Sequence, residues 1–109
     1  MADFLFYNNI LFYIGQLVYH NKFNYRGVII DVDPQFMLPE AWYQKIAKSH
    51  PPKDQPWYRV LVHNSPQQTY VAQRNLTVDK CQEPINHPEI ERYFSGFSDG
   101  KYNLGLRIN

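Results

Sequence analysis

The sequence predicts a mainly β fold, a small barrel of the SH3-like type with a short helical insertion and a short C-terminal helix. The 109 residues suffice for one domain with its own core but not for two. Hydrophobic residues make up 44% and aromatic residues 17% of the chain, and the many tyrosines and phenylalanines favour strands over helices. Four or five short strand patterns are separated by tight turns, and closing such strands into a barrel removes their exposed edges.

The first two strands are expected on either side of a short polar turn. Residues 14–20, IGQLVYH, are β-prone, and NKFN follows as the turn. The second strand is RGVIIDVD, residues 26–33. Side chains alternate between the two faces of a strand. The expected core face holds Val28, Ile30 and Val32, and the other face holds Ile29, Asp31 and Asp33.

An excursion over residues 39–53 is expected between the second and third strands. Pro34 ends the second strand, because proline has no N–H to donate to a ladder. The segment PEAWYQKIAKSH (39–50) begins like a helix, with a proline at its start and Glu40 in the first turn. Trp42, Tyr43 and Ile46 lie on one side of this helix, and the prolines at 51 and 52 end it.

A β-hairpin is expected in the second half of the chain. WYRVLVHN (57–64) has a strand pattern, SPQQ forms the turn, and TYVAQRNL (69–76) is the partner strand. TVDK adds a last short strand, so that the barrel spans residues 14–80. In the C-terminal part, 81–109, HPEIERYF reads as a short helix that docks through Ile90, Tyr93 and Phe94. The glycine-rich tail after it is expected to be flexible and loosely held.

Residues 1–13 form an apolar N-terminal extension. It lacks a basic start and a small-residue cleavage site, and its apolar run is well short of the roughly 20 residues that cross a bilayer. We therefore expect a soluble, cytoplasmic protein with no membrane partner. The apolar side chains must cover the barrel or a neighbouring subunit, which leaves homo-oligomerisation open. These side chains are Phe4, Leu5, Phe6, Ile10, Leu11 and Phe12.

Charge and cysteine content limit the function classes. The formal charge is +1, from 11 Lys and Arg against 10 Asp and Glu, so no global field draws the chain onto nucleic acid. Any contact with DNA has to be local. The single cysteine, Cys81, excludes an internal disulfide and is compatible with a reducing compartment.

Asp31 and Asp33 are the strongest candidates for chemistry, because they share one face of a strand. A metal site would need further ligands, and the four histidines, His20, His50, His63 and His87, are scattered without a metal-binding spacing. The interpretation of the aspartates as turn-forming residues that bind backbone N–H groups explains more of the pattern. No nucleophile, P-loop or dinucleotide motif is present in the sequence, so we expect no enzyme, no metal and no cofactor.

Four blocks in fixed order carry a family resemblance. They are IGQLVYH, YRGVIIDVDP, DQPWYRVLV and TYVAQRNL, within residues 14–76, and they resemble the YccV-like family of hemimethylated-DNA-binding domains typified by the bacterial heat-shock protein HspQ. The later segment HPEIERYFSGFSDGKY is similar to the tail of longer members. The family-pattern positions of the barrel are Gly15, Gly27, Asp31, Asp33, Pro34, Pro56, Trp57, Tyr58, Tyr70 and Ala72.

The resemblance implies a non-enzymatic SH3-like barrel with two alternative activities. One is the binding of hemimethylated DNA, and the other is a stress-response role as an accessory factor of a Lon- or Clp-type protease. Members also occur in F-box proteins, which points toward protein turnover. A third alternative comes from the residues alone: an aromatic cage for a methylated or cationic ligand, which the abundance of tyrosine and tryptophan permits.

For DNA, the candidate contacts lie in the excursion. Lys45, Lys48 and Lys53 cluster there with a histidine and no acid in QKIAKSHPPK, and lysines of this kind contact phosphates without reading sequence. Telling a hemimethylated site from a fully methylated one requires an apolar contact in the major groove, which Trp42 or Tyr43 would supply unless they pin the excursion to the barrel. The near-neutral chain predicts weak, salt-sensitive binding.

Overall fold

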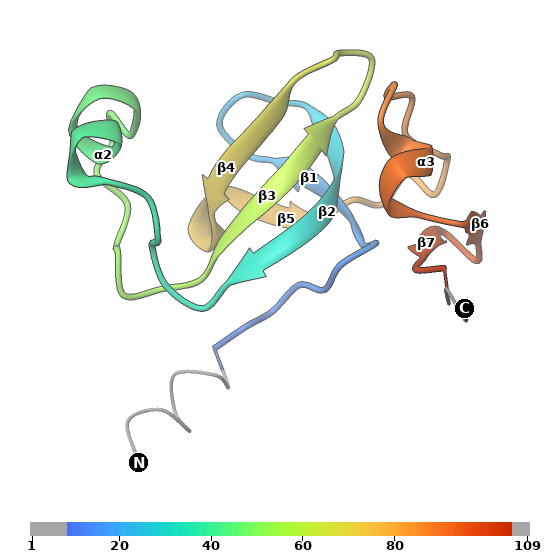
Figure 1. The fold of residues 1–109 in the computed structure, drawn as a ribbon, viewed down its shortest axis with the longest axis horizontal. Helices are drawn as coiled ribbons and strands as arrows, with labels where there is room; N and C mark the ends of the chain where they lie inside the picture. Colours follow the sequence, from blue (N-terminus) through green and yellow to red (C-terminus); the bar gives the residue numbers. More distant parts are fainter. Residues whose placement is uncertain (1–8, 106–109) are drawn as a thin grey trace.

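A computed structural model describes residues 9–105 and confirms the mainly β fold. Five antiparallel strands form one sheet in the order β4-β3-β2-β1-β5 (Figure 1). Their bounds are Leu17–His20 for β1, Arg26–Asp33 for β2, Trp57–Val62 for β3, Gln68–Ala72 for β4 and Leu76–Val78 for β5. The edges of this sheet are β4 and β5, and no ladder joins these two strands within the described residues.

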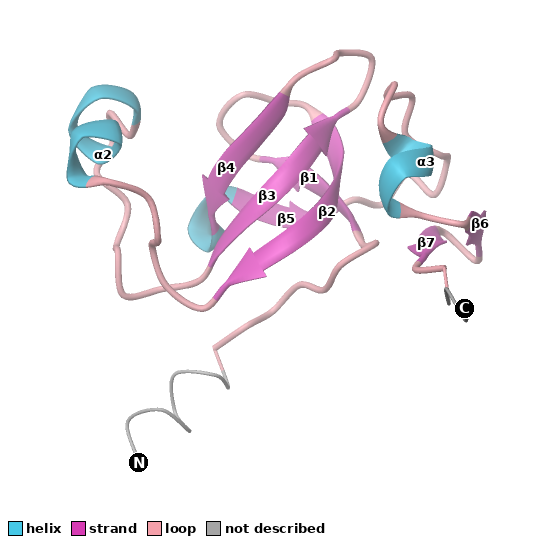
Figure 2. Ribbon diagram, viewed as in Figure 1, coloured by secondary structure: helices cyan, strands magenta, loops and turns pink. Residues whose placement is uncertain are grey.

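The sheet nevertheless curls around one inner core. The short 3-10 helix η1, Gln73–Asn75, connects β4 directly to β5 (Figure 2). Val71 of β4 and Leu76 of β5 therefore pack in the same buried cluster, together with Val60 of the central strand β3. Burial of such side chains stabilises the fold by roughly 1.5–3 kcal/mol each.

A β-bulge in β2 makes the predicted faces of this strand wrong. Ile29 pairs with Val60 and Asp31 pairs with Arg59, which leaves Ile30 as the extra residue. As a result Ile29 and Val32 point into the inner core, whereas Val28 and Ile30 pack on the outer side. Both faces of β2 are thus buried, and Val28, Ile30 and Val32 do not share one face.

The excursion between β2 and β3 contains the helix α2, Glu40–Ile46. Tyr43 is buried, and its hydroxyl donates a hydrogen bond to the carbonyl of Pro51 at 2.7 Å. Trp42 is partly buried beside it. Ile46 is 52% exposed, so of these three side chains Tyr43 is buried, Trp42 is partly buried and Ile46 is open to solvent. The side of α2 that carries Ile46 is therefore available for contacts.

The C-terminal region folds onto the outer side of the sheet. The helix α3, Ile90–Tyr93, is followed by a hairpin of β6, Gly96–Ser98, and β7, Lys101–Asn103. Tyr102 is buried, its hydroxyl accepts a hydrogen bond from the backbone N–H of Ile85 at 2.8 Å, and its own N–H donates to the carbonyl of Gly15. The structure corrects the expectation of a loosely held tail for the residues up to Asn103.

The apolar N-terminal extension is partly described. Phe12 is buried in the inner core and packs edge-on against Tyr58, whose hydroxyl accepts hydrogen bonds from the N–H groups of Leu11 and Phe12. Leu11 is 68% exposed. Phe4, Leu5 and Phe6 lie outside the described residues. Among the helices of residues 9–105, none is long and apolar enough to cross a membrane.

Candidate functional site

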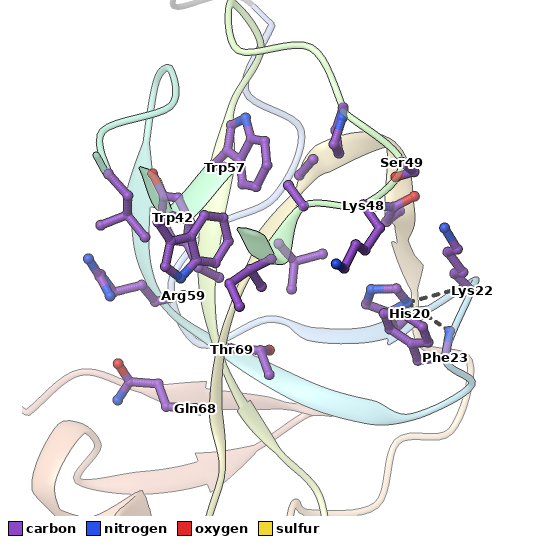
Figure 3. A pocket seen from close by; sticks show the side chains of 18 of the residues that line it. His20, Lys22, Phe23, Trp42, Lys48, Ser49, Trp57, Arg59, Gln68 and Thr69 are labelled. Carbon is purple, nitrogen blue, oxygen red and sulfur yellow. Dashed lines mark hydrogen bonds between the residues drawn. The ribbon is translucent and has the colours of Figure 1, made fainter. Parts of the chain in front are cut away.

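A groove of about 620 Å³ runs beside β4. It lies between the α2 excursion on one side and the β1–β2 turn on the other, with β4 along its length. Figure 3 shows Trp42 and Arg59 at one end, Lys22 at the other, and Lys48 on the excursion between them. The groove has the size of a ligand site, and apolar side chains line most of it.

The charge of this groove differs from that of the whole chain. Lys22, Lys48 and Arg59 line it, and no aspartate or glutamate is among its lining residues. Arg59 is partly engaged, since its Nε lies 3.9 Å from Asp31 and its guanidinium stands over the ring of Tyr70 at 5.1 Å. Lys22 and Lys48 are the exposed cations of the groove. The groove is therefore a local positive site on a nearly neutral chain.

An aromatic cluster holds the excursion against the sheet. Trp57, at the start of β3, stacks on Tyr70 of β4 with ring centroids 5.2 Å apart. Trp42 of α2 meets both rings edge-on, at 6.2 and 5.7 Å, and Phe36 meets Trp57 at 5.0 Å. The indole N–H of Trp57 also donates to the carbonyl of Pro52. These contacts fix α2 and so define one wall of the groove.

The two aspartates have separate structural roles. Asp33 accepts a hydrogen bond from the Tyr70 hydroxyl at 2.6 Å, and that hydroxyl in turn accepts from the N–H of Met37. Burial raises the pKa of Tyr70 above its usual value, and the bond to Asp33 raises it further. Asp31 instead accepts from the N–H of Val32 at 2.9 Å. Both aspartates hold the local structure in place, but the turn-forming interpretation is wrong in its details, because Asp33 binds a side chain of β4 and Asp31 binds the N–H of the next residue in its own strand.

The structure brings together only some of the predicted contact residues. Trp42 and Lys48 line the groove, and Lys45, on the exposed surface of α2, does not. Lys53 turns away: its ammonium pairs with Glu40 and stands 4.3 Å from the ring centroid of Tyr43. The expectation of a lysine cluster free of acid is therefore wrong for Lys53, which lies after α2 and pairs with Glu40 at the start of that helix.

The rings that could form an aromatic cage already contact cationic side chains of the chain itself. Lys53 stands over Tyr43 and, at 5.9 Å, over Phe36, while Arg59 stands over Tyr70. A cationic ligand would have to displace these side chains and approach a groove that already carries Lys22 and Lys48. The geometry therefore disfavours a cationic ligand in this cluster.

Lys22, Phe23 and Arg59 are groove residues that the sequence analysis missed. They come from the β1–β2 turn and from the middle of β3, so only the tertiary fold brings them to the excursion. The one local signal in the sequence was the pair Lys22 and Phe23 in the turn NKFN, because a turn does not require a lysine or a large apolar side chain. The structure shows that Phe23 is exposed.

His20 shapes the turn that carries Lys22. Its Nδ1 accepts hydrogen bonds from the N–H groups of Lys22 and Phe23 at 3.1 and 3.0 Å, and its ring stacks on Phe23. Burial lowers the pKa of His20 below its usual value, and the nearby Lys22 lowers it further. The imidazole must therefore stay neutral for this turn to keep its shape.

Acid should destabilise the fold through His20. Above its ordinary pKa of 6.5 both states are neutral, whereas below it the unfolded chain binds a proton that the folded chain excludes. The free energy of unfolding should fall as the pH drops below that value, and urea titrations at several pH values measure this. His20→Asn, whose side-chain oxygen replaces Nδ1 as acceptor, should flatten the dependence. The exposed His50→Asn variant is the control, and an unchanged slope in His20→Asn contradicts the assignment.

The other buried histidine supports the fold in a similar way. Nδ1 of His87 accepts from the N–H of Glu89 and its Nε2 bonds the carbonyl of Gln67, while Nδ1 of His63 accepts from the N–H of Asn86. Three of the four histidines are thus structural hydrogen-bonding groups. No cluster of three or more potential metal ligands occurs in residues 9–105.

Comparison with known proteins identifies the family of the chain. Residues 10–101 match the family described as "Hemimethylated DNA-binding protein YccV like". The chain belongs to the YccV-like family. The matched region extends beyond residues 14–76 on both sides and takes in α3 and most of the β6–β7 hairpin, so the C-terminal segment is part of the YccV-like domain.

The curated relatives are longer proteins that contain a similar domain. F-box only protein 21 of Homo sapiens, of Mus musculus and of Pongo abelii is 32% identical to the chain over 106 residues. The alignment covers 94% of this chain but 17% of each relative. The chain thus spans about a sixth of the length of these relatives.

The YccV-like pattern positions mostly serve the fold. Gly15 has φ 95°, and Gly27 leaves no room for a side chain, because a Cβ there would lie 2.4 Å from Val60 and 2.7 Å from the Leu61 carbonyl. Pro56 and Tyr58 are fully buried. Three of the pattern positions also line the groove: Trp57, Tyr70 and Ala72. The pattern thus includes residues that position this groove.

Proposed function

We propose that the chain is a non-enzymatic DNA-binding domain that recognises hemimethylated DNA through the groove and the exposed side of α2. The observation that carries this proposal is the set of exposed cations beside an apolar groove that no carboxylate lines. Membership of a family described by hemimethylated-DNA binding supports it. The near-neutral charge of the chain then makes this local site the main electrostatic attraction for a phosphate backbone.

The two parts of the site have different tasks in this proposal. Lys22 and Lys48 contact phosphates on opposite sides of the groove and so position the duplex. Ile46 and Trp42 present apolar surface from α2, and a methyl group on a base is recognised by apolar contact in the major groove. Because Ile46 is largely exposed and packs against little of the sheet, its contact surface is available to DNA.

The test is fluorescence anisotropy with hemimethylated, fully methylated and unmethylated duplexes at two salt concentrations. The wild-type chain should prefer the hemimethylated duplex at both. Lys22→Ala with Lys48→Ala should weaken binding to all three duplexes and reduce the salt slope by about two, one for each lysine. The exposed Lys80→Ala, outside the groove, is the matched control. Equal binding of all duplexes by the wild type, or an effect of Lys80→Ala as large as that of the double variant, contradicts the proposal.

Apolar readout has its own variant in the same assay. Ile46→Gln should keep affinity for the unmethylated duplex within about threefold but remove most of the preference for the hemimethylated duplex, because a lost methyl contact changes discrimination by about 1 kcal/mol. Since Ile46 is exposed, this substitution leaves the core intact. Preserved discrimination in Ile46→Gln would assign the readout to another surface.

A role in protein turnover is the second candidate, because the curated relatives are F-box proteins and Leu11 is exposed at the start of the described chain. An accessory factor for a Lon- or Clp-type protease needs an apolar segment that its partner grips. Phe12 is not part of such a segment, since it is buried against Tyr58. A deletion that probes this role must therefore end before Phe12, or it removes part of the core.

A further inference from the structure

We infer that the open edge of β4 binds an extended acidic peptide by strand addition. β4 pairs with β3 on one side only, and within residues 9–105 no strand pairs with its other side. Gln67 and the whole of β4 line the groove, so the groove gives access to this edge. An extended peptide that joins a sheet edge gains main-chain hydrogen bonds from the edge and specificity from neighbouring pockets.

The register of the β3–β4 ladder shows which backbone groups are free. Gln67 accepts from the N–H of Val62, and the N–H of Gln73 donates to Pro56, so the hydrogen-bonded pairs fall at 67, 69, 71 and 73. In an antiparallel ladder the alternate residues turn their backbone groups away from the partner strand. The N–H groups of Gln68, Tyr70 and Ala72 therefore point to the open edge.

The shape of the groove around this edge is suited to an added strand. Thr69 and Val71 line it from one face of β4, and Gln68 and Tyr70 line it from the other, so alternate side chains of an added strand would meet different walls. Arg74 donates to the carbonyl of Ser49 and joins the end of the excursion to η1. This contact ties the excursion to the chain just after β4.

The charge of the groove selects an acidic partner. Its exposed cations, Lys22 and Lys48, belong to the two opposite walls, and no carboxylate lines it. Carboxylates on an added strand would meet both lysines, whereas a basic peptide would be repelled. This inference goes beyond the proposed DNA function. It uses the same two lysines but adds the backbone of β4, so a change in that backbone separates the two functions.

Amide hydrogen exchange measured by NMR tests the inference on the full chain. The probes are an acetylated octapeptide of repeated Val-Val-Glu-Glu, which presents carboxylates to both walls, and the same peptide with lysine in place of glutamate. In the free chain the amides of Gln68, Tyr70 and Ala72 should exchange faster than those of Thr69 and Val71. The glutamate peptide should slow these three amides by about tenfold or more, and the lysine peptide should not. Exchange unchanged by the glutamate peptide overturns the inference.

Gln68→Pro removes one outward N–H while leaving the ladder bonds to β3 intact, as proline is tolerated on an edge. It should weaken peptide binding by about tenfold, whereas Gln68→Val, which keeps the N–H, should stay within about twofold. Gln68→Pro should leave DNA binding unchanged, so the two functions fail separately. Two further results overturn the inference. One is slow exchange of these three amides in the free chain that becomes fast when residues 1–8 are deleted. The other is protection of these amides by duplex DNA but not by the glutamate peptide.

Discussion

Gly15→Ala should destabilise the fold by about 3 kcal/mol or more. This is the largest effect that we expect from a substitution that only adds atoms. Gly15 has φ 95°, a conformation that alanine adopts only with strain. A Cβ at this position would also lie 2.3 Å from the carbonyl oxygen of Tyr102. That oxygen belongs to the backbone of the C-terminal hairpin, so relief requires the hairpin to move away from the sheet.

The measurement is urea unfolding followed by circular dichroism, with Gly96→Ala as the matched control. Gly96 lies in the same hairpin, but a Cβ there meets no atom within 4 Å. The control should therefore stay within about 0.5 kcal/mol of the wild type. A Gly15→Ala variant that unfolds at the same urea concentration as Gly96→Ala would show that the hairpin does not press on Gly15.

Trp57→Ala should cost about 3–5 kcal/mol, a large part of the stability of a domain of this size. Trp57 is 1% exposed and joins β3 to the excursion through its contacts with Phe36, Tyr43 and Tyr70. Its removal leaves a cavity between the sheet and α2. Because α2 forms one wall of the groove, the same variant should also lose its preference for hemimethylated DNA wherever it remains folded.

Two tryptophan variants separate packing from the hydrogen bond. Trp57→Phe keeps much of the ring volume and loses the bond to Pro52, so it should cost less, about 1–2 kcal/mol. Trp42→Ala removes a partly buried ring from the same cluster and should also cost less than Trp57→Ala. Chemical denaturation of the three variants gives the order of their free energies of unfolding. If Trp42→Ala costs as much as Trp57→Ala, the excursion is held mainly by Trp42 of α2 and not by Trp57.

The sequence predicted where most strands lie because turns mark their ends, but residues 73–75, expected within the strand 69–76, form η1, and Leu76 begins β5. Residues 26–33 were expected as a strand and form β2 with the same bounds. The faces of β2 were not predictable, because a bulge changes the alternation without any change in composition, and Ile30 has no feature that distinguishes an extra residue from a paired one. Because both faces of β2 are buried, the apolar pattern did not show which side chains point into the inner core.

The C-terminal hairpin was missed although it has a local signal. Asp99 and Gly100 both have positive φ, 54° and 74°, as the two central residues of a tight hairpin turn require. The dipeptide Asp-Gly was visible in the sequence, but the glycine content of the tail was interpreted as looseness. What the tail packs against, Gly15 and Ile85, lies too far along the chain for any local pattern to show.

The groove could be predicted only in part for a similar reason. Trp42 and Lys48 lie on one continuous segment and were expected to act together. Lys22 and Arg59 belong to separate turns and strands, and their approach depends on the curl of the sheet. Lys53 lies on the expected segment but pairs with Glu40, which sequence distance alone did not reveal.

The position of β5 in the sheet requires a long loop of the chain to close during folding. Its pairing with β1 joins Val18 to Val78, 60 positions apart, whereas the β1–β2 pairing joins Leu17 to Val28, 11 positions apart. Closing the longer loop costs about 1.5 kcal/mol more, since the cost grows with the logarithm of loop length. The pairing that completes the sheet is therefore the one that takes the most conformational freedom from the unfolded chain.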